Sequence, residues 1–143
     1  MRRSESGGML LLYLIAAGLF SVSALVLMLA HQRMEKVRVY ASEAAARSAA
    51  RSGLARAEAA LGSGDLGYEG EELSWPGGQE ALVRVFRRGD QWPTYEVSVR
   101  GSCQGPRGRQ AVRSIRAIFE TREGRVVLIT AELVPRAELA QLR

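Results

Sequence analysis

The chain has 143 residues and a formal net charge of +5, from 20 Lys and Arg against 15 Asp and Glu. One His and one Cys, Cys103, exclude an internal disulfide and supply too few ligands or nucleophile–base pairs for the usual metal or covalent catalytic site. We therefore expect no enzyme, no cofactor and no small-molecule substrate, while the positive balance suits an anionic partner without requiring one.

An uncharged apolar stretch runs from Met9 to Ala30. At about 1.5 Å per residue, it forms a helix long enough for the roughly 30 Å hydrocarbon core of a bilayer. A secretory signal peptide has a shorter apolar stretch and a small-x-small cleavage site, which Met28-Leu29-Ala30 matches poorly. The sequence therefore predicts a single-pass membrane protein. Cations flank the span on both sides, so their distribution does not decide its orientation.

Small residues share one face of this predicted span. Ala17, Ser21 and Ala24 are spaced so that another helix could approach closely, although chance also produces such a spacing. We name these three as candidate helix-packing positions.

Residues 31–61 predict a helix that continues from the span without a break. The segment lacks Gly and Pro before Gly53 and is rich in Ala, which favours a helix. We expect Leu54 and Leu61 to be packing positions, and Gly62 to end the helix. Apolar or small residues recur mostly three or four positions apart, at Met34, Val37, Ala41, Ala44, Ser48, Ala50, Leu54, Ala57 and Leu61.

The chain changes character beyond the helix. Gly62 to Gly78 holds six glycines and four acids but no Lys or Arg, which predicts an irregular surface connection. Four runs then favour strands. The third run, Arg109–Arg122, also fits a helix, but we choose a strand because short turns usually join strands that pair as neighbours. The predicted elements are strands Ala81–Arg88, Thr94–Gly101, Arg109–Arg122 and Val126–Ala131, a turn at Gly89–Pro93, and a short helix at Pro135–Arg143.

These elements predict an α+β fold, in which a long N-terminal transmembrane-to-soluble helix precedes a small antiparallel β-sheet of three to four strands. Their order resembles the type IV pilin and type II secretion pseudopilin superfamily. The shared features are a short basic leader ending in Gly7-Gly8, an apolar helix beginning at Met9, an Ala-rich continuation, a glycine-rich loop and a small sheet. The layout is most similar to minor pilins and K-type pseudopilins, whose membrane helix also runs into an Ala-rich stretch like Ala44 to Leu61.

The resemblance implies four regions: a leader at 1–8, a transmembrane helix at 9–30, an amphipathic extension at 31–61 and a β-rich domain at 62–143. It implies cleavage by a prepilin peptidase after Gly8 and methylation of Met9. The family's glutamate at the fifth mature position is absent, and Tyr13 stands there. This departure implies either a special place such as the filament tip, where K-type members also lack the acid, or a chain that is not cleaved.

The implied function is that of a structural subunit of a membrane-assembled filament, in a type IV pilus, a type II secretion system or a competence system. Its partners would be the membrane, the peptidase and other pilin-like subunits, which it would contact through the N-terminal helix. The implied location is the bacterial inner membrane, with the C-terminal domain outside the cytoplasm, from which the subunit enters a periplasmic or cell-surface filament.

Two alternatives stay open. One is a membrane-anchored scaffold that is neither processed nor polymerised. The other is nucleic-acid binding, because alternation along strands could place Arg84, Arg100 and Arg116 on one sheet surface near Trp92 or Tyr95 for base stacking. We favour a simpler interpretation of these cations, in which they pair with the acidic loop or keep the domain soluble.

Overall fold

The computed structural model describes residues 3–89 and 93–135, with side chains from residue 8 onward. The predicted terminal helix at Pro135–Arg143 and the centre of the predicted Gly89–Pro93 turn lie outside the described residues. The chain divides into two compact units, Met1–Val37 and Arg38–Arg143. The helix α1, Arg3–Gly62, contributes residues to both units.

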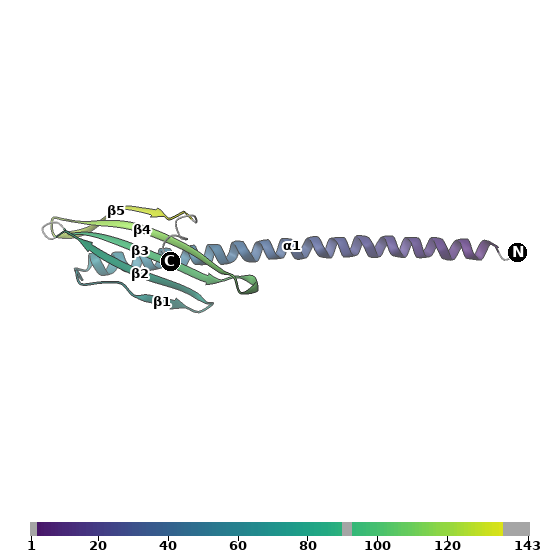
Figure 1. Cartoon of the computed structure of the whole chain (residues 1–143), viewed down its shortest axis with the longest axis horizontal. Helices are drawn as coiled ribbons and strands as arrows, with labels where there is room; N and C mark the ends of the chain where they lie inside the picture. The colour runs from purple at the N-terminus through teal and green to yellow at the C-terminus, as the bar shows by residue number, and fades with distance from the viewer. Residues whose placement is uncertain (1–2, 90–92, 136–143) are drawn as a thin grey trace. The chain divides into compact units, whose positions relative to one another are not determined.

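The second unit contains an antiparallel sheet in which every strand pairs with its neighbour in sequence. The sheet has five strands. Figure 1 shows them side by side, with the end of α1 against one face. The α+β fold predicted from the sequence is confirmed, with five strands rather than three to four. The strands are β1 (Glu72–Trp75), β2 (Gln79–Arg88), β3 (Thr94–Gln104), β4 (Gln110–Arg122) and β5 (Arg125–Leu133).

β1 lies inside Gly62–Gly78, which the sequence predicted to be wholly irregular, so that prediction was wrong for four residues. Its four residues, ELSW, alternate between exposed polar and half-buried apolar side chains, a signal too short to predict a strand by itself. The strand pairs with β2, with Glu72 opposite Leu82 and Trp75 opposite Gln79. The segment before it also follows β2, because the amide of Val83 donates to the carbonyl of Glu71 at 2.9 Å. Pairing with β2, which follows β1 directly through the turn at 76–78, therefore orders this part of the loop.

The core of the second unit lies between residues 38–62 of α1 and one face of the sheet. Tyr95, Val97, Val99 and Phe119 supply its bulk from the strands, and small residues supply the helix side. The predicted helical face is confirmed at Ala50, Ala57 and Leu61, which are buried. It is wrong in the first half of the segment, where Ala41, Ala44 and Ser48 are exposed. In a segment this rich in alanine, several faces are small enough to be buried, so periodicity does not select one. The buried helix positions are Ser42, Ala46, Ala49, Ala50, Gly53, Ala57 and Leu61.

Two glycines set how closely the helix approaches the sheet. A Cβ on Gly53 would lie 2.7 Å from Cγ1 of Val99, and a Cβ on Gly101 would lie 2.5 Å from the backbone nitrogen of Ala50 and closer still to the carbonyl oxygen of Ala46. Side chains at these positions would force the two layers apart. The close contact explains how a helix with small residues can fully bury Val97 and Val99.

A largely buried ion pair fixes the same interface. Nη2 of Arg113 on β4 lies 2.7 Å from Oε2 of Glu43 on α1, and the two side chains are only 17% and 21% exposed. Separating the two side chains would leave a poorly solvated charge on each. The pair therefore favours this position of the helix on the sheet over positions in which Glu43 and Arg113 do not meet.

Tyr95 carries a buried hydroxyl without a hydrogen-bond partner among the described residues, although its side chain is only 1% exposed. We expect Tyr95→Phe to raise the free energy of unfolding by about 1 kcal/mol, because burying an unpaired hydroxyl carries a desolvation cost that phenylalanine does not have. Urea unfolding of the full chain in detergent micelles, followed by tryptophan fluorescence, measures this change. Tyr68→Phe removes a hydroxyl that does have a partner, so it should not be stabilising; equal gains from both variants would contradict this explanation.

Candidate assembly and binding surfaces

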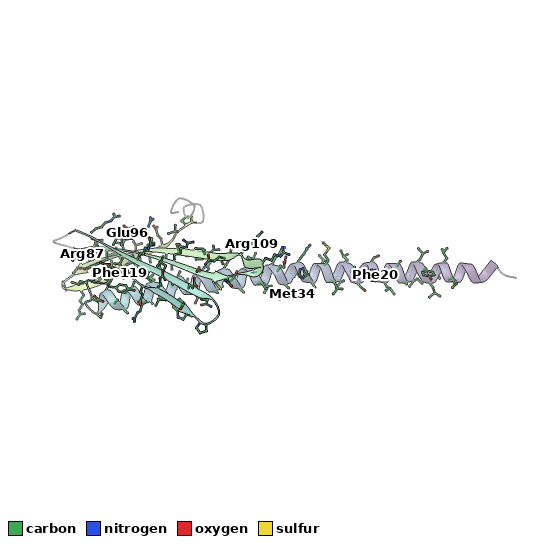
Figure 2. The ribbon with its side chains drawn as sticks, turned by 60° about the horizontal axis from the view of Figure 1, so that its bottom comes forward. Phe20, Met34, Arg87, Glu96, Arg109 and Phe119 are labelled. Carbon is green, nitrogen blue, oxygen red and sulfur yellow. The ribbon has the colours of Figure 1, made fainter. Side chains whose placement is uncertain are left out.

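The first unit presents one continuous apolar helix surface. Every side chain from Met9 to Ala30 is exposed, including Leu19 at 65% and Phe20 at 77%. Figure 2 shows Phe20 projecting from this part of α1. The helix is long and apolar enough to cross a membrane. A solvent-facing surface of this size is unfavourable in water, and a lipid or protein environment would remove that cost.

The polar groups within this surface are compatible with lipid. The hydroxyl of Ser21 donates to the carbonyl of Ala17 at 2.8 Å, and that of Ser23 donates to the carbonyl of Leu19 at 2.9 Å. These bonds satisfy each hydroxyl inside the helix, which lowers the cost of placing it in hydrocarbon. Ala17, Ser21 and Ala24 lie along one side of α1 and are exposed, so a second helix could approach there.

The other proposed positions on α1 have different environments. Gly8 and Met9 are exposed and helical, and a Cβ on Gly8 would meet no atom within 4 Å. Leu61 is 1% exposed, and Leu54 packs against the same core, so both contact the chain's own sheet. Of the five predicted helix-packing positions, Leu54 and Leu61 therefore pack within the chain, and Ala17, Ser21 and Ala24 are the candidates for packing against a helix of another subunit.

The three candidate anion-binding arginines share the sheet face that is turned away from α1. Arg84 on β2 and Arg116 on β4 both lie opposite Ser98 of β3, while Arg100 lies two residues further along β3, opposite Leu82 and Ser114. The three arginines differ in their charged neighbours, because the carboxylate of Glu96 lies beside one of them. Glu96 approaches Arg116 at 3.6 Å and Arg88 at 2.7 Å, whereas among the described residues Arg84 and Arg100 form no ion pair.

The aromatic part of the nucleic-acid hypothesis does not fit this face. Tyr95 pairs with Arg87 and Phe119 on the opposite, buried face, so it cannot stack on a base beside Arg84. Trp92, the other candidate, lies outside the described residues. The partner of Arg116 is Glu96 on the neighbouring strand, and not the acidic loop that the sequence suggested.

A polar cluster that the sequence did not reveal ties the loop to the helix. Oε1 of Glu71 accepts from Nε of Arg56 at 2.8 Å and from the hydroxyl of Tyr68 at 2.9 Å. The bond from Arg56 holds the pKa of the Glu71 carboxyl below its usual range, with a further contribution from Tyr68. Burial, followed by the bond to Glu71, raises the pKa of Tyr68 from 10.0 to about 12. Arg56 and Glu71 are 15 residues apart, so their pairing has no local sequence signal.

The raised pKa of Tyr68 predicts a stability loss in alkali. An unfolded chain releases the phenolic proton near pH 10, whereas the folded chain retains it until about pH 12, so the stabilisation is complete below pH 10 and is lost between these values. We expect the free energy of unfolding to fall less for Tyr68→Phe than for the natural chain between about pH 9 and about pH 11.5. Urea unfolding at both pH values tests this, and equal falls would contradict it.

Among residues 8–89 and 93–135, no three His, Cys, Asp or Glu side chains are placed to hold a metal ion. Comparison with protein-family models, with curated proteins and with solved structures finds no match to the chain. The geometry therefore carries the functional argument. It combines an exposed apolar helix with a helix–sheet unit that has mixed charges on its outer face and whose edge strands, β1 and β5, each pair with one strand among the described residues.

Proposed function

We propose that this chain is a minor pilin or pseudopilin-like structural subunit, stored in the bacterial inner membrane by residues 9–30 and assembled into a filament through that helix. The observation that carries the proposal is the continuity of α1, which begins as an exposed apolar helix and ends as the helix that packs on the sheet. No catalytic group is needed, because extraction from lipid into a bundle of similar helices keeps the same apolar surface out of water.

Sequence features at the start of the helix add support. Gly7-Gly8 directly precedes the apolar residues, as expected for processing by a prepilin peptidase between Gly8 and Met9. Tyr13, where the family has a glutamate, leaves a mature terminal amine without the usual carboxylate partner. We propose that this restricts the chain to a position at which a neighbouring subunit does not require that acid, such as the tip.

A site-specific photocrosslinker tests the assembly step. Placed at Ser21 of the full chain in cells with an intact assembly system, the probe should yield adducts with other pilin-like subunits, identified by mass spectrometry. The matched probe at Phe20, one residue round the same helix, should give fewer such adducts, because large side chains hold a second helix further away. Absence of protein adducts at both positions would support a simple membrane anchor and overturn the proposal.

A further inference from the structure

Three arginines surround one serine on the outer face of the sheet, which is the face turned away from α1. Arg84 of β2 and Arg116 of β4 both lie opposite Ser98 of β3. Arg100 follows Ser98 by two residues on the same strand. The two residues that flank Ser98 in sequence are fully buried in the core on the opposite face. We call the three cations, Arg84, Arg100 and Arg116, the arginine cluster.

Sheet geometry places the arginine cluster within reach of a common point. Neighbouring strands lie about 4.8 Å apart, so the Cα atoms of Arg84 and Arg116 are about 10 Å apart, with Ser98 midway between them. Arg100 is a diagonal neighbour of both arginines at about 7–8 Å, a spacing that long side chains bridge. An anion above Ser98 can therefore accept hydrogen bonds from three guanidinium groups and from the serine hydroxyl.

Two members of the arginine cluster have no anionic partner within the described part of the chain. Arg84 and Arg100 are exposed and form no ion pair there. Arg116 shares the carboxylate of Glu96 with Arg88, which lies closer to it, at 2.7 Å against 3.6 Å. Like charges at neighbouring positions of a sheet are destabilising, and a bound anion would remove this repulsion.

Carboxylates border the arginine cluster and limit the size of the anion. One precedes Ser98 by two residues on β3, a second lies opposite Arg116 on β5, and two more line a hollow of about 480 Å³ beside Arg100. A nucleic-acid strand laid across the face would bring further phosphates close to these carboxylates, whereas a single compact anion would not. The bordering residues are Glu96, Glu132, Glu72 and Glu80.

We infer that the arginine cluster and the hydroxyl of Ser98 form a binding site for one compact dianion of the phosphate class, either inorganic phosphate or the phosphate group of a monoester. Each guanidinium offers a planar fork of N–H donors that matches two oxygens of such a group. The site goes beyond the proposed function and does not depend on it, because all four residues belong to the sheet of the second unit.

Isothermal titration calorimetry of the full chain in uncharged detergent micelles at low salt tests the site. At about pH 8, inorganic phosphate and methyl phosphate are mainly dianions. We expect inorganic phosphate to bind with a dissociation constant of about 1 mM, at least about fivefold more tightly than the monoanion dimethyl phosphate. Methyl phosphate distinguishes the two sources, because equal affinity would identify a monoester and several-fold weaker affinity would identify the free ion. Binding of neither dianion, or equal binding of dimethyl phosphate, would overturn the inference.

Neutral substitutions then locate the site. Arg84→Gln and Arg100→Gln should each weaken the binding of inorganic phosphate about three- to fivefold. Arg87→Gln is the matched control, because Arg87 is an exposed arginine of β2 without an ion pair among the described residues, but it lies opposite Tyr95 on the other face of the sheet. Equal losses in the control would contradict a site on the outer face.

Removal of a bordering carboxylate tests the site by a gain of binding, which a damaged fold would not produce. Glu132 is exposed, lies opposite Arg116 and forms no ion pair within the described residues. Glu132→Gln should tighten the binding of inorganic phosphate about two- to threefold, because it removes a like charge from the border of the site. Unchanged or weaker binding in this variant would contradict the placement of the dianion beside Arg116.

Discussion

Gly101→Val is expected to lower the free energy of unfolding of the second unit by about 3 kcal/mol or more. A Cβ at this position would collide with the backbone of α1 at Ala46 and Ala50, and a helix backbone cannot rotate away as a flexible side chain can. Relief would require the helix to move off the sheet, which would open the contacts that bury Val97 and Val99. Urea unfolding of the full chain in detergent micelles provides the measurement.

Gly62→Ala is the matched control for that substitution. Gly62 is the last residue of α1, and a Cβ there would meet no atom within 4 Å. The control should therefore change the free energy of unfolding by no more than about 0.5 kcal/mol. If Gly101→Val lowered the free energy of unfolding no more than the control does, the close approach of helix and sheet would be refuted.

Leu19→Asp should have an effect of similar size on a different property, the insertion of α1 into a membrane. Leu19 lies near the centre of Met9–Ala30, where exchanging leucine for aspartate costs about 3–4 kcal/mol, or more than a hundredfold in the insertion equilibrium. The natural chain should remain in membranes after alkaline carbonate extraction, and the variant should be released.

Leu66→Asp provides the comparison for the membrane experiment. Leu66 is 46% exposed in the loop of the second unit, so the same chemical change there should leave membrane retention unaltered. Retention of Leu19→Asp at the level of Leu66→Asp would show that residues 9–30 do not anchor the chain.

The parts of the fold with a strong local signal were predictable. The apolar length of residues 9–30 and the lack of helix breakers before Gly53 led to one long N-terminal helix, and the alternation around Tyr95, Val97 and Val99 led to β3. The ambiguous run at Arg109–Arg122 forms β4, because pairing along β3 decided between two periodicities that the sequence carried equally.

The remainder depends on tertiary partners. β1 pairs with β2, and its four-residue alternation was too short to predict it; the buried face of the alanine-rich segment includes Ala46 and Ala50, where Gly101 allows a close approach. The same holds for charges, since Glu71 and Arg56 are brought together by the loop, and Glu43 finds Arg113 from a distant strand. Sequence spacing placed Arg84, Arg100 and Arg116 on strands but could not show that Glu96 lies beside Arg116.

The mass and N-terminal sequence of the chain, purified from membranes of cells with and without a prepilin peptidase, test the central claim most directly. The account predicts a start at Met9, with one added methyl group, only in cells that contain the peptidase. A chain that retains residues 1–8 in both strains, intact or merely without its first methionine, would contradict processing as a pilin-like subunit and leave a membrane-anchored helix–sheet protein.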